Sequence, residues 1–296
     1  MKISITGAPV FYGCDIPGVE TAPAKLRQMG LVEMLRAAGH EVTDAGDVPV
    51  PAAAVSEKNA CHPTIKYTAQ IGEMCSALSQ RVAGALGEGR FPLVIGGDHS
   101  DGIGILSGVA RVYGPDTAVL WIDSHSDIHS FATSPSGNVH GVPLGAAIGL
   151  ECGPFGEHFG DTYIKGSNLF IAGLRSYEPE EAATIAREGV NAYSVEDFRR
   201  RGVEDIFADI GRKLAAAGVC ALHVSFDIDS LDPAIAPGTG IRVPGGFTAD
   251  EAVRIVRAAF ATGLVHSMDI SELNPLRDRD DMTARIAMQV AAAIPV

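Results

Sequence analysis

The chain has 296 residues, of which 46% are hydrophobic and 20% are charged. This composition is ordinary for a globular protein and excludes a mainly disordered chain, a collagen-like chain and a coiled coil. Acidic residues outnumber basic ones by 36 to 23, which gives a formal net charge of −13. Because nucleic acids and anionic membranes are bound through basic patches, we expect neither as a partner. The acidic excess suits metal cations or a small cationic substrate.

The chain contains five cysteines, and no two of them have the CxxC spacing. This pattern disfavours a zinc ribbon, a thioredoxin-type site and a disulfide framework, so reduced thiols in a cytoplasmic protein fit best. The apolar run within residues 1–6 is too short for a signal peptide. No apolar stretch reaches the length of about 18 residues that a membrane span needs.

Short apolar runs alternate with helical patterns along the chain. The runs are typical of strands buried on both faces of a parallel sheet, and they comprise Ile3–Ile5, Leu93–Ile95, Ala118–Ile122, Leu169–Ala172, Val219–Phe226 and Leu264–Ile270. Helix signals between them include an apolar periodicity from Thr64 and capping sequences at Ser194 and Thr248. Residues 45–63 and 149–166 are expected to be surface excursions. The alternation predicts one doubly wound α/β domain over residues 1–296.

Polar residues follow four of the apolar runs at their carboxyl ends, where an open parallel sheet binds ligands. These segments are Gly96–Ser100, Asp123–Asp127, Asp227–Asp229 and Ser271–Pro275. Alternate residues of an extended chain point to one face, so neighbouring ligands can gather there. The potential metal ligands are four carboxylates and two imidazoles, namely His99, Asp123, His125, Asp127, Asp227 and Asp229.

Four carboxylates at adjacent strand ends would repel one another and raise each other's pKa. Two divalent cations about 3.5–4 Å apart remove this conflict, and a shared water then ionises to hydroxide near neutral pH. Oxygen-rich ligation with some imidazole suits Mn²⁺, while Zn²⁺, Fe²⁺, Co²⁺ and Ni²⁺ stay open. A single DxHxD segment is also compatible with a solvated turn, but three such segments at buried strand ends indicate a dinuclear site.

Structural roles are expected for several other residues in and around these segments. Gly96 and Gly97 are expected to let the backbone turn tightly before the first metal-binding histidine. Asp98 is interpreted as a supporting or structural carboxylate rather than a ligand. Asp269 lies within a predicted strand, where a further site carboxylate and a buried group paired to the backbone are both open, and the structural role is favoured. Nucleotide binding is disfavoured because the glycines from Gly102 onward lack the GxGxxG spacing. Surface or hydrogen-bonded core positions are expected for His40, His62, His158, His223 and His266.

Three motifs resemble the signatures of the ureohydrolase family, which includes arginase, agmatinase and formimidoylglutamase. They are Gly-Gly-Asp-His-Ser at 96–100, Asp-Ser-His-Ser-Asp at 123–127 and Ser-Phe-Asp-Ile-Asp-Ser-Leu-Asp-Pro at 225–233. The resemblance implies a three-layer α/β/α fold with a central, mostly parallel sheet, two Mn²⁺ per subunit and a homotrimer or homohexamer. One metal would be held by His99, Asp123, Asp127 and Asp227, and the other by Asp123, His125, Asp227 and Asp229.

The resemblance also implies that the protein hydrolyses a guanidino C–N bond. Glu272 stands where similar enzymes carry the glutamate that binds the guanidinium, and carboxylates pair with that planar group in a bidentate way. His140 matches the family's proton-shuttling histidine, and imidazole has a suitable pKa for this role. Taken alone, Glu272 is also compatible with a turn carboxylate and His140 with an ordinary loop histidine.

The loop at 133–138 is similar to the arginase version, which implies that L-arginine is hydrolysed to L-ornithine and urea. Candidate groups for the far end of the substrate are His129, Ser134, Ser136, Asn138 and Glu178. Three residues depart from the arginase pattern: His129 replaces an asparagine, Glu178 an aspartate and Ile241 a threonine. Agmatine, a guanidino acid and a formimidoyl amino acid therefore stay open as substrates, as does a non-catalytic metal-binding homologue.

Overall fold

Eight strands form one sheet in the computed structural model, which describes all 296 residues. Their order is β2-β1-β3-β8-β7-β4-β5-β6, and every neighbouring pair is parallel. The strands are β1 (Lys2–Ala8), β2 (Glu41–Asp47), β3 (Phe91–Gly96), β4 (Thr117–Ile122), β5 (Leu169–Ala172), β6 (Asn191–Tyr193), β7 (Ala221–Asp227) and β8 (Val265–Ser271). The predicted parallel sheet is confirmed.

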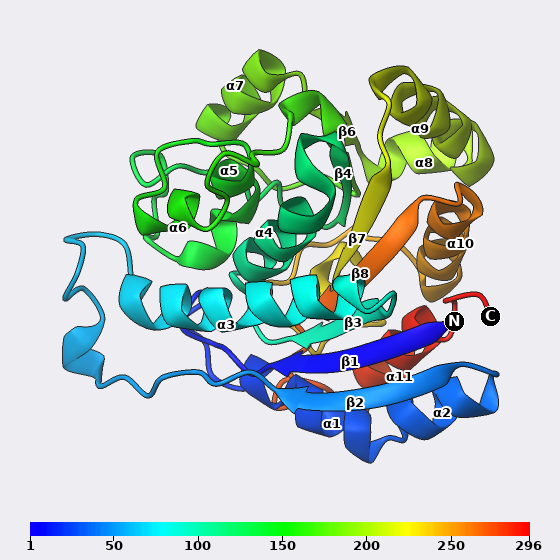
Figure 1. Cartoon of the computed structure of the whole chain (residues 1–296), viewed down its shortest axis with the longest axis horizontal. Coiled ribbons are helices and arrows are strands. Elements are labelled where there is room, and N and C mark those ends of the chain that lie inside the picture. Colours follow the sequence, from blue (N-terminus) through cyan, green and yellow to red (C-terminus); the bar gives the residue numbers. More distant parts are fainter.

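Eleven α-helices surround this sheet (Figure 1). They are α1 (Ala22–Gln28), α2 (Leu31–Ala37), α3 (Thr68–Gly87), α4 (Asp101–Tyr113), α5 (Pro143–Ala147), α6 (Pro154–Glu157), α7 (Pro179–Glu188), α8 (Val195–Arg201), α9 (Val203–Ala217), α10 (Ala249–Ala261) and α11 (Met282–Ala291). Not one of these helices combines the length and the apolar composition needed to cross a membrane.

Two hydrophobic cores lie on opposite faces of the sheet. Alternate residues of β4 point to opposite cores, because side chains of a strand alternate between its faces: Leu120 belongs to one core and Trp121 to the other. Helices α1, α2 and α8 to α11 contribute to the first core, and α3 to α6 contribute to the second. The fold therefore has the expected three layers, with the sheet in the middle.

The six predicted strands and both capped helices are confirmed. The hydroxyl of Ser194 accepts the backbone N–H of Asp197 at the start of α8, and that of Thr248 accepts the N–H of Glu251 at the start of α10. Sequence reasoning missed the two edge strands: β2 is largely polar, and β6 has only three residues. Edge strands need no continuous apolar run, since one side of them is unpaired.

Two predicted boundaries differ from the structure. The helical pattern from Thr64 becomes a helix only at Thr68. The segment 149–166, expected to be a surface excursion, contains the short helix α6 and buries the ring of Phe155 completely. The high glycine content of this segment favoured a surface loop in the sequence analysis, although its Phe155 is a core residue.

Glycines allow α3 and α4 to approach closely. A Cβ atom at Gly104 would lie 2.8 Å from the carbonyl oxygen of Cys75, and one at Gly108 would lie 2.7 Å from that of Ser79. Both distances are shorter than side chains tolerate, so these positions need glycine for helix packing. Helix packing therefore explains why α4 contains Gly104 and Gly108, and no nucleotide-binding role is needed to account for them.

Candidate metal centre

The four polar segments of the sequence follow four neighbouring strands, β3, β8, β7 and β4. All strands are parallel, so these segments meet at one edge of the sheet. The structure brings every predicted metal ligand to this edge. The six side chains divide into two groups that share the carboxylate of Asp123.

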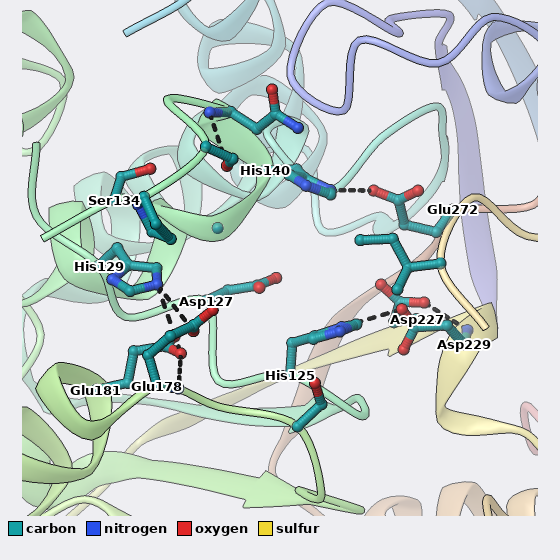
Figure 2. A pocket seen from close by; sticks show the side chains of 16 residues that line it. His125, Asp127, His129, Ser134, His140, Glu178, Glu181, Asp227, Asp229 and Glu272 are labelled. Atoms are coloured by element: carbon teal, nitrogen blue, oxygen red, sulfur yellow. Dashed lines mark hydrogen bonds and ion pairs between the residues drawn. The ribbon is translucent and has the colours of Figure 1, made fainter. Parts of the chain in front are cut away.

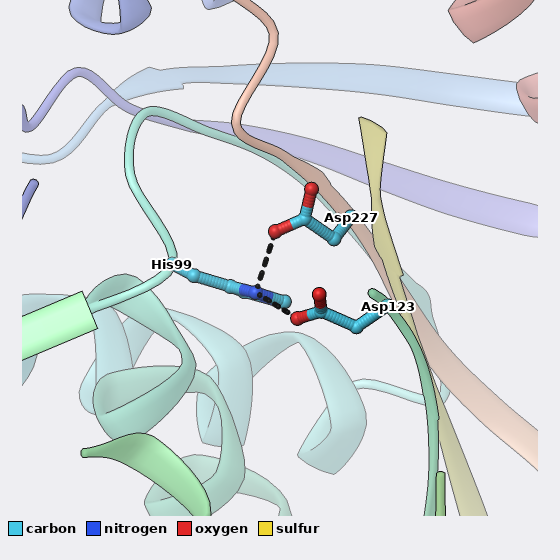
Figure 3. A group of neighbouring side chains, drawn as sticks. All are labelled: His99, Asp123 and Asp227. Carbon is cyan, nitrogen blue, oxygen red and sulfur yellow. Dashed lines mark ion pairs between the residues drawn. The ribbon is translucent and has the colours of Figure 1, made fainter. Parts of the chain in front are cut away.

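The first group is centred on the ring of His99 (Figure 3). Its Nδ1 atom lies 3.1 Å from Asp123 Oδ2, 3.1 Å from Asp127 Oδ2 and 3.0 Å from Asp227 Oδ2. The histidine is 1% exposed and Asp123 is fully buried. Three carboxylate oxygens and one imidazole nitrogen thus converge on one buried point.

The second group contains Asp123, His125 and Asp229. The Nδ1 atom of His125 lies 3.1 Å from Asp229 Oδ2 and 3.5 Å from Asp123 Oδ1. The two oxygens of Asp123 therefore face different histidines, as a bridging ligand requires. The other predicted bridge, Asp227, uses its Oδ1 atom to accept the backbone N–H of Asp229 at 2.5 Å.

Neighbouring groups fix the orientation of these carboxylates. The indole N–H of Trp121 donates to Asp123 Oδ2 at 2.9 Å, and the backbone N–H of His125 donates to Oδ1 at 2.7 Å. The hydroxyl of Ser124 donates to Asp229 Oδ1 at 2.6 Å. The positive φ of Asp127, 48°, is a conformation that few residues other than glycine adopt, and such strain is common at functional sites. The site is therefore held in shape by its surroundings.

The donor set fits divalent cations. The Nδ1 atom of His99 is buried and makes no hydrogen bond of acceptable geometry, although three carboxylate oxygens surround it. Burial, followed by the charges of Asp229 and Asp123, raises the pKa of Asp227 well above its usual range. Buried charges without partners are unfavourable, and cations between these oxygens would compensate them.

The glycines before His99 have a different role from the one predicted. Neither Gly96 nor Gly97 has a positive φ angle, so no left-handed turn requires them. A Cβ atom at Gly96 would lie 1.9 Å from Asp101 Oδ2, and one at Gly97 would lie 1.9 Å from the carbonyl oxygen of Val10. Lack of a side chain, rather than a special backbone conformation, allows the close packing beneath the histidine.

A pocket of about 240 Å³ opens above the metal centre (Figure 2). None of its sixteen lining residues is lysine or arginine, so its charged groups are carboxylates and imidazoles. The predicted catalytic and substrate-binding residues all line it, namely His129, Ser134, Ser136, Asn138, His140, Glu178 and Glu272. An acidic pocket of this kind is complementary to a cation.

Glu272 and His140 form an ion pair beside the metal ligands. His140 Nδ1 lies 3.0 Å from Glu272 Oε1, which also accepts the backbone N–H of His99 at 3.0 Å. Burial opposes the charge of both groups, but the pair prevails: it lowers the pKa of Glu272 and raises that of His140 to about 9. Glu272 directly follows β8 and has a φ angle of 64°, in the left-handed region that residues other than glycine rarely adopt. At neutral pH the pair is a carboxylate and an imidazolium.

The far end of the pocket contains a histidine between two glutamates. His129 Nε2 lies 3.2 Å from Glu178 Oε2 and 3.5 Å from Glu181 Oε2, and its Nδ1 lies 3.0 Å from the hydroxyl of Thr133. Sequence reasoning missed Glu181. Its position three residues after Glu178, in a capping box at the start of α7, was the available signal.

The loop at 134–138 presents two hydroxyl groups to the pocket. Ser134 Oγ accepts the backbone N–H of Gly137, and Ser136 Oγ accepts that of Asn138, so both hydroxyls keep a proton to donate. The amide of Asn138 is partly engaged, because its Oδ1 accepts from Lys66 at 2.6 Å and one N–H of its Nδ2 donates to a backbone carbonyl at 3.2 Å. The free donors of this loop are therefore the two serine hydroxyls and the second N–H of the Asn138 amide.

Arg175, which sequence reasoning also missed, connects the loops around the centre. Its guanidinium donates to the backbone carbonyls of Asp229 at 2.7 Å and Val243 at 2.8 Å. Three longer contacts, at 3.1, 3.3 and 3.4 Å, reach the carbonyls of Gly173, Ser230 and Leu231. No carboxylate pairs with it. An isolated arginine in a sequence gives no sign of such backbone contacts.

The model of the arginase family matches residues 1–295. The chain belongs to the arginase family. It is 32% identical to the arginase of Bacillus subtilis (strain 168) over 293 residues, which cover 99% of this chain and 97% of the relative. It is also 32% identical to the hepatic arginase of Aquarana catesbeiana, with 98% and 90% covered. The solved arginase structure from Bacillus caldovelox superimposes with a TM-score of 0.90 at 31% identity, with 99% and 97% of the chains covered.

As a member of the arginase family, the chain is a hydrolase that acts on a guanidino group, and its His/Asp clusters are candidate metal-binding sites. The assignment agrees with the predicted ureohydrolase resemblance. Ile241, which is 37% exposed, and Ser176 also line the pocket. Sequence reasoning did not single out Ser176 as a site residue, nor Trp121, which lies outside the pocket and donates a hydrogen bond to Asp123.

Proposed function

We propose that this protein is an arginase that hydrolyses L-arginine to L-ornithine and urea with two Mn²⁺ per subunit. The observation that carries the proposal is the acidic pocket directly above two groups of His and Asp side chains that share Asp123. The matches to the two arginases named above extend over nearly the whole length of those relatives, which supports L-arginine as the substrate.

The residues that would hold the metals are His99, Asp123, Asp127 and Asp227 on one side, and Asp123, His125, Asp227 and Asp229 on the other. When bound, the two cations supply the Lewis acidity that ionises a water near neutral pH. The predominance of carboxylate oxygens favours Mn²⁺ over metals that prefer thiolates. Elemental analysis of the reconstituted protein should give two manganese ions per chain.

The remaining chemistry belongs to the Glu272–His140 pair. Glu272 keeps its negative charge in a buried position, where a carboxylate can bind and orient the planar guanidinium by bidentate hydrogen bonds. His140 carries a proton at neutral pH and lines the same pocket, so it can deliver that proton to the leaving amine. Guanidinium binding by Glu272 would compete with its bond to His140, which frees the imidazolium at the moment its proton is needed.

The far end of the pocket is suited to an α-amino acid. Glu178 and Glu181 offer negative charge to an ammonium group, and the hydroxyls of Ser134 and Ser136 offer hydrogen bonds to a carboxylate. His129 lies between the two glutamates, and its ring is directed toward them. Together these groups could bind both the ammonium group and the carboxylate of a zwitterion.

Agmatine is the second candidate substrate. No lysine or arginine lines the pocket, and the imidazolium of His140 is paired with Glu272. A substrate carboxylate would therefore meet no unpaired cation, whereas an ammonium group would meet the carboxylates of Glu178 and Glu181. A panel of L-arginine, agmatine, a guanidino acid and a formimidoyl amino acid, assayed for urea and amine release with the Mn²⁺-loaded protein, separates the candidates. Turnover of agmatine without turnover of L-arginine would contradict the proposal.

We also propose that the protein is cytoplasmic, in line with its five free cysteines. The family resemblance supports a homotrimer or a homohexamer. Light scattering coupled to size-exclusion chromatography measures the mass directly, and a monomer under all conditions would contradict this part. Cell fractionation tests the location.

A further inference from the structure

One face of the central strands β7 and β8 is polar although it is buried. The register places polar residues directly opposite one another in three successive pairs, His223 with Ser267, Ser225 with Asp269 and Asp227 with Ser271. All six are 2% exposed or less. The proposed mechanism uses only Asp227. The remaining five form a hydrogen-bonded row beneath the metal centre, and buried polar groups of this kind are unfavourable unless each has a partner.

Asp269 is the acceptor at the middle of this row. Ser225 donates its hydroxyl proton to Asp269 Oδ2 at 3.1 Å. The hydroxyl of Ser271 lies 2.9 Å from the same oxygen and 3.2 Å from Asp101 Oδ2, so its single proton is shared between the two carboxylates. His223 Nε2 lies 2.9 Å from Asp269 Oδ1. Carboxylate oxygens accept hydrogen bonds from hydroxyl and ring N–H groups. The hydroxyl proton of Ser225 is therefore directed toward Asp269.

This direction fixes the state of the next residue. The Nε2 atom of His99 lies 2.8 Å from Ser225 Oγ. Since the single hydroxyl proton of Ser225 points to Asp269, Ser225 can only accept in this contact, and Nε2 of His99 must carry a proton. A neutral imidazole has one N–H, so Nδ1 then presents a lone pair. Independently, Nδ1 is the atom that makes no hydrogen bond and faces the three carboxylate oxygens.

The position of the ring is fixed by a separate contact. His99 stacks on Trp121 with the ring centroids 3.9 Å apart and the planes at 13°. Stacking holds the face of the ring but does not distinguish its two nitrogens. The choice of tautomer is thus left to the hydrogen bond at Nε2.

We propose that Asp269, acting through Ser225, is a positioning residue that holds His99 in the tautomer whose Nδ1 binds the metal. The inference rests on the proposed metal centre. Hydrogen bonds from a metal-binding histidine to a second partner commonly set ring orientation and metal affinity. Here the partner is a serine, and the carboxylate stands one residue further away, on the neighbouring strand.

The test compares three variants of the full chain. Ser225→Ala removes the acceptor at Nε2, and Asp269→Ala releases the hydroxyl proton of Ser225, which can then turn toward Nε2 and favour the wrong tautomer. Ser107→Ala is the matched control, because Ser107 is also fully buried but donates only to the carbonyl of Gly104 in its own helix. Stepwise Mn²⁺ dissociation constants are measured by electron paramagnetic resonance on metal-free protein, with melting temperatures as the control for folding.

We expect Ser225→Ala and Asp269→Ala to bind one of the two Mn²⁺ ions about 10- to 100-fold more weakly, and Ser107→Ala to bind both like the wild type. Wild-type affinity in either relay variant overturns the inference, and so does equal weakening in the control. If Asp269→Ala fails to fold, Ser225→Ala decides alone. A wild-type protein that binds no Mn²⁺ would instead contradict the proposed function, which separates the two failures.

Discussion

Replacement of Arg175 by methionine should destabilise the protein and weaken its metal centre. The guanidinium connects the loop that carries Asp229 to the chain segment at Val243 through backbone carbonyls alone. Methionine can fill much of the space of the aliphatic stem, so the change mainly removes hydrogen bonds rather than packing. The carbonyls that lose their donor are near the metal ligands, and their loop would shift.

The expected loss follows from the two short contacts. Each is a hydrogen bond from a charged donor, at 2.7 and 2.8 Å, and such bonds contribute about 1.5 kcal/mol or more to stability. The three contacts longer than 3.0 Å add little by comparison. The buried Nε atom of Arg175 has no partner, so its removal offsets part of the loss. The net decrease in the free energy of unfolding should be about 2–3 kcal/mol.

Urea unfolding of metal-free protein measures this difference, and Mn²⁺ titration measures the effect on the centre. Arg254→Met is the matched control, because Arg254 pairs with Glu204 on the surface, where the two side chains are 56% and 77% exposed. Surface pairs of this kind contribute little to stability, because water and salt screen their charges. If Arg175→Met costs no more than the control and binds Mn²⁺ normally, the structural role assigned to these carbonyl contacts is wrong.

Four further predictions concern the site itself. Asp229→Ala should lose one metal ion by elemental analysis, because its carboxylate faces His125 at 3.1 Å. Glu272→Gln should keep both ions and lose at least about 100-fold in rate, since a neutral amide cannot pair with a guanidinium charge; an unchanged rate would refute its role. The pKa of His140 in the free protein is raised to about 9, and the proton donor is active below its pKa, so kcat/KM should fall as pH rises through about 9; His140→Gln should remove this limb and lower kcat/KM by about 10²–10⁴-fold. Chelation of the metals should lower the free energy of unfolding by about 2.7 kcal/mol for each bound ion, relative to protein at a metal concentration 100 times the dissociation constant, whereas identical unfolding curves would contradict a resident metal.

The central strands were predictable from sequence because they are buried on both faces. Runs such as Leu93–Ile95 and Ala118–Ile122 have no polar interruption and end at glycine or aspartate. The edge strand Glu41–Asp47 has mainly exposed residues, so neither length nor periodicity marks it. The strand order was not predictable either, because β3 and β8 are neighbours although more than 160 residues separate them in the sequence.

The metal ligands were predictable because their motifs place the donor atoms directly, with two-residue spacing at strand ends. The supporting residues were harder to find because they act through partners distant in sequence. Asp269 and Ser225 alternate with apolar residues inside strands that were interpreted as continuously apolar, and this alternation was the available signal. Arg175 binds only main-chain carbonyls, whose arrangement no side-chain pattern encodes.

The strand order has a consequence for synthesis on the ribosome. Strand β8 lies between β3 and β7 in the middle of the sheet (Figure 1), yet it is the last strand to be made. Until it emerges, the two halves of the sheet each expose an unpaired apolar edge, which is prone to association with other chains. A chain that ends before Val265 would contain all six proposed metal ligands but would lack the strand that joins the two halves of the sheet.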